Sequence, residues 1–265
     1  MRRTAEFRRS TALPHVEARR SCQENLCYRP HAHDSFSIGA IDAGTSVLRG
    51  PLDGATRLEA GDLVVIPAGQ VHACNPEEGR WLYQMIHMDQ DWAVSLVPGG
   101  EASRLLDGIS VLRRPGLLSP METLSDAIFS DEGRGTIEAR LAVLFAELDA
   151  ASPAYLARSD VDPDLLARLA PVMRRLRSDA SNPALSELAE SIGMTKYQLI
   201  RAMRRATGLS PLAWRQNARI QRARHLLRGG RTIAETAYAL GFTDQSHFHR
   251  VFRAHVAASP GAYRG

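Results

Sequence analysis

The segment GFTDQSHFHRVF, residues 241–252, places Gln, Ser, two His and an Arg between phenylalanines. Side chains of these types can bind a metal ion, take part in hydrolysis or hydrogen-bond to DNA bases. Geometry excludes a metal site on a helix, because His247 and His249 are two residues apart and point about 200° away from each other. Neither GxSxG nor HExxH surrounds them, which excludes the common hydrolase motifs. Base reading is the chemistry that remains.

A base-reading helix needs one face that packs inward and one face that meets DNA. A helix from about 244 to 256 would bury a single stripe, made of Phe248, Val251, Phe252 and His255. A helix from about 195 to 207 would bury Leu199 and Met203 in the same way. Gly193 and Gly241 suit the left-handed end of the helix before each of them. Thr195 caps the first of these helices, and either Thr243 or Asp244 caps the second.

The outward face of each helix supplies the predicted DNA contacts. Candidates for the groove are Tyr197, Gln198, Ile200 and Arg201 on the first helix and Gln245, Ser246, His249 and Arg250 on the second. The residues predicted to contact phosphates, which set affinity rather than sequence, are Thr195, Arg204, Arg205, Thr243 and Arg253.

The two helices belong to an internal repeat. RAMRRATGLSPLAWR (201–215) aligns without gaps with RVFRAHVAASPGAYR (250–264), and LAESIG (188–193) aligns with AYALG (237–241). Each copy has the pattern of a helix-turn-helix unit, a short helix, a turn with Gly and a second amphipathic helix. Between the copies, residues 211–228 form one predicted helix, about 27 Å long at 1.5 Å per residue. Successive major grooves lie about 34 Å apart, so one chain can present two reading helices, with some bending of the DNA.

The charge is divided between the two halves of the chain. Residues 165–265 carry 17 Lys plus Arg and 5 acidic residues, whereas residues 1–164 carry 16 and 24. A basic domain of this size favours a polyanionic partner, most often a nucleic acid. The three cysteines, Cys22, Cys27 and Cys74, are odd in number and lack CxxC spacing, which predicts reduced cytosolic thiols. No apolar run is long enough to predict a membrane span, and no secretory signal is expected.

The first half has the pattern of a β domain followed by helices. Short strands are predicted at 35–44, 61–69 and 80–88, which suggests an antiparallel sandwich or small barrel. A helix over about 136–150 carries one apolar stripe, made of Ile137, Leu141, Leu144, Phe145 and Leu148. That stripe has two interpretations, pairing of two chains or packing on the chain's own barrel. The segment 152–164 has no hydrophobic periodicity and is the predicted linker.

Residues 183–264 resemble the AraC/XylS family of bacterial transcription regulators. The resemblance rests on RIQRARHLL (219–227), IAETAYALGFTDQSHFHRVFR (233–253) and SPGAYR (259–264). It implies two helix-turn-helix units joined by a helix, and it places base reading at Tyr197, Ile200, Arg201, Gln245, Ser246, His249 and Arg250. One departure is Ala257, where the family usually has the Gly that the first unit keeps as Gly208.

The first half is more weakly similar to the cupin-type sensor domain common in that family. The similar segments are RPHAHDSFSIGAIDAG (29–44) and GDLVVIPAGQVHACNP (61–76). Metal-binding cupins use an HxH pair, a Glu and a later His, and here His31, His33 and His72 match while the Glu is missing. The resemblance favours an effector site at these histidines and Tyr83. A metal site or purely structural histidines are the alternatives, and no cofactor is predicted.

Together these features predict a two-domain protein. A cupin-like antiparallel β-barrel with trailing helices spans 1–151, with an arm at 1–25, the barrel at about 26–95 and helices at about 100–151. The linker is 152–164, and an all-α domain of two helix-turn-helix units spans 165–265. The Arg-rich arm is predicted to attach loosely and to report the ligand state of the sensor.

The predicted function is sequence-specific, effector-controlled transcription regulation in the bacterial cytoplasm, without enzymatic activity. Expected partners are double-stranded DNA, a small-molecule effector, RNA polymerase and a second copy of the chain, with no membrane. A cupin metalloenzyme fused to a DNA-binding domain and an architectural DNA binder of low specificity are the alternative functions.

Overall fold

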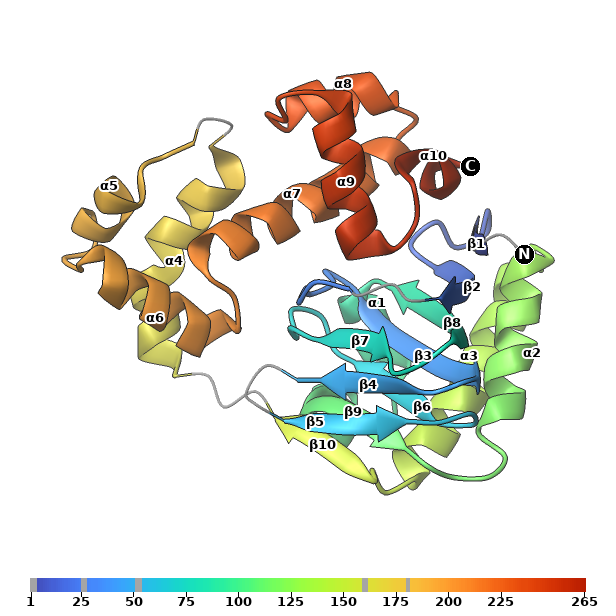
Figure 1. The fold of residues 1–265 in the computed structure, drawn as a ribbon. Coiled ribbons are helices and arrows are strands. Elements are labelled where there is room, and N and C mark those ends of the chain that lie inside the picture. Colours follow the sequence, from blue (N-terminus) through green and yellow to red (C-terminus); the bar gives the residue numbers. More distant parts are fainter. Residues whose placement is uncertain (1–3, 25–27, 51–53, 159–161, 180–181) are drawn as a thin grey trace. The chain divides into compact units, whose positions relative to one another are not determined.

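A computed structural model of the protein describes residues 4–24, 28–50, 54–158, 162–179 and 182–265. Its contacts divide the chain into two compact units. The first comprises residues 1–27 and 32–159, and the second comprises residues 160–265 together with 28–31. The first unit is rich in strands and the second is helical (Figure 1). Cys27, one of the predicted reduced thiols, lies outside the described residues.

Two antiparallel sheets form the first unit. The larger has the strand order β1-β2-β8-β3-β6-β9-β10 and the smaller has the order β5-β4-β7. The strands are β1 (Thr4–Arg9), β2 (Glu17–Glu24), β3 (Phe36–Ala43), β4 (Ser46–Arg49), β5 (Ala55–Leu58), β6 (Leu63–Ile66), β7 (Ala73–Pro76), β8 (Arg80–Met88), β9 (Gly108–Leu112) and β10 (Tyr155–Arg158). The helices of this unit are α1 (Gln90–Leu96), the 3₁₀ turns η1 (Gly100–Ala102) and η2 (Arg104–Leu106), α2 (Leu118–Phe129) and α3 (Arg134–Ala150).

One face of the larger sheet is covered by helices, and the main core of the unit lies between them. Phe36 and Ile38 of β3 join the helical residues in one buried cluster. The rings of Phe36 and Phe145 meet edge to face, with their centroids 5.9 Å apart. Because side chains alternate along a strand, the neighbours of these residues point to the opposite face of the sheet. That opposite face carries Ser37 of β3 and His87 of β8, which alternate with core residues of the same strands.

The apolar stripe of α3 belongs to this core. All five of its residues have no exposed surface: Ile137, Leu141, Leu144, Phe145 and Leu148. They pack against α2 and the sheet, so of the two interpretations the stripe packs on the chain's own barrel. Burial within the chain removes the stripe as a surface for pairing two chains.

The arm and the linker both contribute strands, contrary to the sequence analysis. Within the predicted arm 1–25, β1 pairs with β2, and β2 pairs along its full length with β8. Within the predicted linker 152–164, β10 pairs with β9, a strand that was itself expected to be helical. β1 (TAEFRR) and β2 (EARRSCQE) are rich in Arg and Glu and lack the apolar alternation by which half-buried strands are recognised, and β10 (YLAR) is too short to show it. Pairing with neighbouring strands overrides this weak local preference.

The second unit consists of seven helices within the described residues. They are α4 (Pro163–Ser178), α5 (Leu185–Glu190), α6 (Lys196–Thr207), α7 (Pro211–Arg228), α8 (Ile233–Ala239), α9 (Gln245–Val256) and α10 (Pro260–Arg264). In Figure 1, α7 connects the group α4–α6 with the group α8–α10. Among the described residues, no helix has the length and apolar character needed to cross a bilayer.

The predicted repeat is visible in the caps as well as in the helices. Helices α6 and α9 both have 12 residues and occupy equivalent positions of the two copies. Ser210 and Ser259 cap the helices that follow, each by accepting from a backbone N–H three residues ahead. Gly193 and Gly241 adopt the left-handed conformation expected of them, with φ of 66° and 67°.

Helix α9 ends on a strained residue. Ala257 is the C-cap of α9 with φ 51°, whereas its counterpart in α6, Gly208, has φ 74°. An L-residue pays a steric cost in this region because its Cβ approaches the carbonyl oxygen, and glycine does not. The departure from the family pattern at position 257 therefore falls on a conformation that favours glycine.

We expect Ala257→Gly to raise the free energy of unfolding by about 0.5 kcal/mol, since relief of backbone strain is partly offset by greater freedom of the unfolded chain. The matched change Gly208→Ala should lower it by about 1 kcal/mol. Urea unfolding of both variants measures the two signs. A loss of stability in Ala257→Gly would contradict this account of the cap.

Candidate nucleic-acid interface and histidine cluster

Helix α6 is started by a reciprocal cap. The Thr195 hydroxyl accepts from the backbone N–H of Gln198 at 3.2 Å, and the Gln198 side chain accepts from the backbone N–H of Thr195 at 2.8 Å. These two bonds satisfy N–H groups that a helix start otherwise leaves without partners. Gln198 is thus engaged in the cap, which explains why it is less suited to base reading than its neighbours.

Helix α9 starts with a different cap at the equivalent position. The carboxylate of Asp244 accepts from the backbone N–H of His247 at 2.6 Å. The Thr243 hydroxyl lies 3.1 Å from Nδ1 of His247, so Thr243 supports the turn from its side chain. Of the two predicted caps, Asp244 is therefore the residue that accepts from the helix. The hydrogen bond from His247 is the main cause that lowers the pKa of Asp244 below its usual value.

The inward faces of the two helices agree with the sequence analysis. Leu199 and Met203 of α6 are fully buried, as are Phe248 and Phe252 of α9. Val251 and His255 are also buried, and Nδ1 of His255 donates to the backbone oxygen of Val251 at 2.8 Å. Each helix is held by this apolar face, which orients the opposite face outward.

The predicted DNA contacts lie mostly on the exposed faces. The exposed residues of this set are Thr195, Tyr197, Arg201, Arg204, Arg205, Thr243, Gln245, Ser246, Arg250 and Arg253. Arg201 and Arg250 occupy equivalent positions of the repeat, as do Arg204 and Arg253. The two helices therefore present the same pair of guanidinium groups one turn apart.

Two predicted base-reading residues are less exposed than the rest. Ile200 is half-buried and apolar, so it offers contact with thymine methyl groups rather than hydrogen bonds. His249 is half-buried, and within the described part of the chain its Nε2 is covered without a hydrogen-bond partner. A change of rotamer would be needed for this nitrogen to reach a base.

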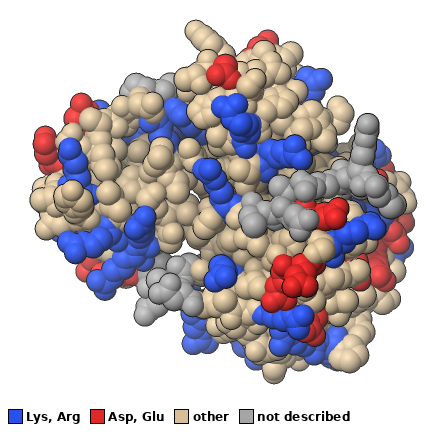
Figure 2. Space-filling view, viewed as in Figure 1, with Lys and Arg blue, Asp and Glu red and all other residues tan. Residues whose placement is uncertain are grey.

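The positive charge of the second unit divides between surface and interior. Figure 2 shows many Lys and Arg side chains over this unit on the face in view. Two arginines of α7, however, are buried. Arg215 donates to the side chain of Asn182 and to the backbone oxygen of Asp179, and Arg224 donates to the Tyr263 hydroxyl at 3.1 Å. These two guanidinium groups make contacts within the fold. The net charge of the unit is therefore larger than the positive charge available to contact DNA.

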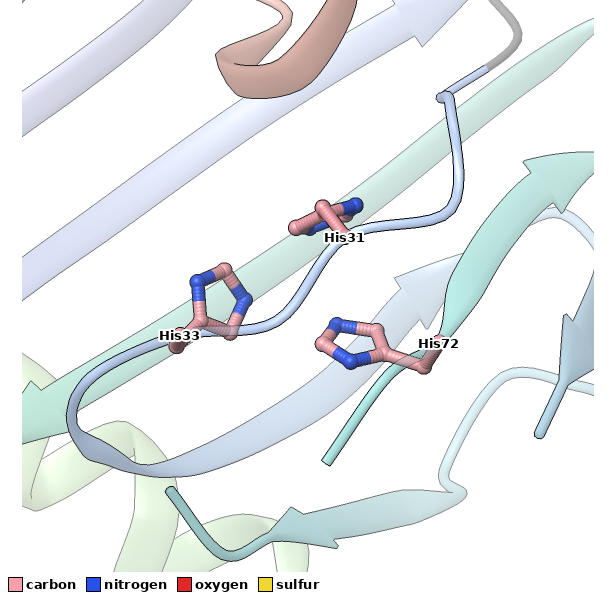
Figure 3. A group of neighbouring side chains, drawn as sticks. All are labelled: His31, His33 and His72. Carbon is pink, nitrogen blue, oxygen red and sulfur yellow. The ribbon is translucent and has the colours of Figure 1, made fainter. Parts of the chain in front are cut away.

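A histidine cluster lies in the first half of the chain, where the sequence predicted it. Figure 3 shows the rings of His31, His33 and His72 around a common space. Each offers a nitrogen, and these nitrogens all lie within 4.8 Å of one another. His33 and His72 come from segments before β3 and β7, with ring centroids 4.9 Å apart. His31 and His33 lie outside the strands, with only an isolated bridge at His31.

Burial sets the protonation of His72. Desolvation lowers the pKa of His72 to about 4, against a smaller opposing effect of its hydrogen bond to the Gln70 backbone oxygen. A neutral imidazole at neutral pH keeps a lone pair, which is needed to ligate a metal or accept a hydrogen bond.

A fourth histidine was missed by the sequence analysis. His87 of β8 is buried, with its ring centroid 4.8 Å from that of His33. Its Nδ1 lies 2.8 Å from the hydroxyl of Ser37. The alternation of RWLYQMIHM places His87 on the same face as Tyr83, and this was the available signal.

Tyr83 lies on the same face of the sheet as His87. Its ring stacks on Trp81 at 4.2 Å between centroids, and the guanidinium of Arg19 lies 5.3 Å from the Tyr83 ring. Arg19 is buried and donates to the Ser21 hydroxyl at 2.6 Å. The Trp81–Tyr83 pair and the Arg19 guanidinium thus form a cation–π cluster on this face of the sheet.

Two family models match the chain in the order of its two units. The AraC-like ligand binding domain matches residues 13–195, and a helix-turn-helix domain matches residues 188–265. The first match alone covers more than half of the sequence.

The chain belongs to the AraC family. It is a DNA-binding transcription regulator with a ligand-binding domain, which fits the cupin-like first unit and the two helix-turn-helix motifs of the second.

Curated members of this family align with most of the chain. The HTH-type transcriptional regulator YbfI of Bacillus subtilis is 29% identical over 237 residues, which cover 88% of this chain and 86% of that protein. The arabinose operon regulatory protein of Escherichia coli is 24% identical over 217 residues, covering 77% and 72%. Both relatives are transcription regulators by name.

Solved structures share the two-domain fold. ToxT of Vibrio cholerae superposes with a TM-score of 0.60 at 12% identity, covering 94% of this chain and 97% of that one. At this identity the likeness concerns the fold alone.

We expect the cap of α9 to make stability depend on pH. The depressed pKa of Asp244 in the folded chain means that its contribution is present above pH 3.8, its unfolded value, and is lost as pH falls through the lower folded value. Asn caps helices without titrating, so Asp244→Asn should reduce the loss of stability on acidification. Urea unfolding at pH 6 and at about pH 3 compares the variant with the native chain. Equal acid sensitivity of the two would contradict this role.

Proposed function

We propose that this regulator reads its operator with α6 and α9, and that Arg250 and Arg201 are the main base-reading side chains. Both are exposed and occupy the same position of the repeat, six residues after each N-cap. A guanidinium group can donate twice to guanine in the major groove. Tyr197, Gln245 and Ser246 lie on the same exposed faces and complete the reading set with the half-buried Ile200 and His249.

The proposed phosphate contacts lie on the same exposed faces of α6 and α9. Arg204 and Arg253 lie one turn beyond the base-reading arginines, and Arg205 is exposed beside Arg204. Contacts of this kind fix register and affinity without reading sequence. Thr195, the cap of α6, and Thr243, which precedes the cap of α9, stand at the helix starts, where backbone N–H groups and the helix dipole favour a phosphate.

Helix α7 sets the separation of the two reading helices. Its 18 residues span about 27 Å, less than the roughly 34 Å between successive major grooves. We infer that the operator bends when both helices enter it. The deformability of the uncontacted base steps would then contribute to specificity.

We propose that the first unit binds a small effector and thereby shifts the population competent to bind DNA. The AraC-like ligand-binding match supports this role. ToxT has been solved with an unsaturated fatty acid bound, which is a property of that protein. Tyr83, stacked on Trp81 near the buried Arg19, together with the histidine cluster provides the candidate contacts in this chain.

The other partners are also proposals. The relatives are transcription regulators, and we infer that this chain is likewise a regulator rather than an enzyme, acts on DNA in the cytoplasm and contacts RNA polymerase. A homodimer would have to use a surface other than the buried stripe of α3. Val143, on the outer face of that helix, is 56% exposed.

We expect Arg250→Ala to abolish discrimination at one base position, with a loss of about 1–3 kcal/mol on the operator and little change on other DNA. Arg253→Ala is the matched control, because it removes a guanidinium one turn away that is proposed to contact phosphate. This control should weaken binding to all sequences and reduce the salt slope by about one unit. Competition binding on the DNA upstream of the gene, at several salt concentrations, measures both.

An equal loss on all sequences in both variants would favour the architectural DNA binder. A footprint over two adjacent major grooves, lost selectively in Arg250→Ala and Arg201→Ala, would support the sequence-reading regulator.

A further inference from the structure

The two reading helices differ in the chemistry of two equivalent positions. In the repeat, Tyr197 of α6 corresponds to Ser246 of α9, and Ile200 of α6 corresponds to His249 of α9. The position after the second pair is Arg in both helices. The first helix is therefore apolar at two places where the second carries a hydroxyl and an imidazole, while the arginine is the same.

Tyr197 and Ile200 form a small apolar patch beside this arginine. They are three residues apart on α6, and Arg201 lies four residues after Tyr197, so all three share one face of the helix. Tyr197 is 77% exposed and Ile200 is half-buried. Leu199 and Met203 pack inward with no exposed surface, which orients the patch toward the exterior.

The charge of α6 favours DNA over a protein as the partner of this patch. The helix contains one Lys, three Arg and no acidic residue. Arg201, Arg204 and Arg205 are all exposed. A polyanion can neutralise such a surface, with Arg204 and Arg205 at the phosphates and the apolar patch against the base edges.

The base edges of the major groove distinguish the chemistry of the two helices. Thymine is the only one of the four bases that presents a methyl group there, and apolar side chains recognise it by contact. Hydroxyl and imidazole groups instead donate or accept hydrogen bonds. The side-chain oxygen of Gln198, near the start of α6, accepts from the Thr195 N–H in the cap. Apolar contact is thus the recognition that Tyr197 and Ile200 add to the arginine.

We propose that the two half-sites of the operator, one for each reading helix, are read by different chemistry. Tyr197 and Ile200 of α6 contact thymine methyl groups in one half-site, whereas Ser246 and His249 of α9 form hydrogen bonds in the other. This inference rests on the proposed reading of DNA by α6 and α9, and it adds the bases that the first half-site must contain. The operator then carries thymine beside the guanine read by Arg201, and it is not a direct repeat of one sequence.

The test replaces thymine by uracil, which forms the same base pair and lacks only the 5-methyl group. The loss of base discrimination in Arg201→Ala and in Arg250→Ala first assigns the two half-sites of the footprinted operator. The full-length chain is then titrated onto operators that carry uracil in one half-site or in the other. We expect about fourfold weaker binding for each contacted methyl group in the α6 half-site, and a change of less than about twofold in the α9 half-site.

Tyr197→Ala is the main variant, because an exposed side chain can be removed without disturbing the core. It should lose the uracil effect at the thymine that it contacts, and Ile200→Ala should do the same at its own position, as a double-mutant cycle measures. Tyr197→Phe keeps the ring and should keep the effect. Ser246→Ala, at the equivalent position of α9, is the matched control and should leave the uracil effect of the α6 half-site unchanged.

Several results would overturn the proposal. They are uracil effects of equal size in the two half-sites, no effect in the α6 half-site, and an effect that persists in both Tyr197→Ala and Ile200→Ala. The last result would assign the effect to the shape of the DNA rather than to contact with the methyl group.

Failure of the proposed function gives a different result. If the native chain leaves no selective footprint on the upstream DNA, the reading of DNA by α6 and α9 fails, and this inference fails with it. A selective footprint that is insensitive to uracil overturns the thymine contacts alone and leaves the regulator function in place.

Discussion

The DNA-binding unit depends on the attachment of α7 to helices at both of its ends. Near its start, buried Arg215 donates to Asn182 and to the backbone of Asp179. Nearer its end, Arg224 donates to the Tyr263 hydroxyl, and Arg224 and Arg228 lie over the Tyr263 ring. Because burying an arginine without partners is costly, these contacts favour one arrangement of each helix-turn-helix motif against α7. The separation of α6 and α9 is thereby set by the length of a single helix.

The first unit combines an apolar core and a polar face on one sheet. The core face carries Phe36 and Ile38 against the helices, and the opposite face carries Arg19, Tyr83 and His87. Strand alternation alone separates these two sets of side chains. The helices therefore stabilise the sheet through the face that carries Phe36 and Ile38.

The sequence by itself determined the features that depend on neighbours along the chain. Helix α7 was predicted at its observed bounds of 211–228, and both Gly193 and Gly241 adopt the left-handed conformations that were expected. The buried faces of α6 and α9 also follow from helical period. These features are readable because caps, turns and amphipathic stripes involve residues a few positions apart. Membership of the AraC family follows from the same spacings.

Only the tertiary structure decided what distant segments do. The strands β1, β2 and β10 form because partners are available in the sheet, and the stripe of α3 is buried because that sheet lies beside it. His87 joins His33 from more than fifty residues away. In these three cases burial and strand pairing between remote segments outweigh local preference, and no local pattern records which segments will meet.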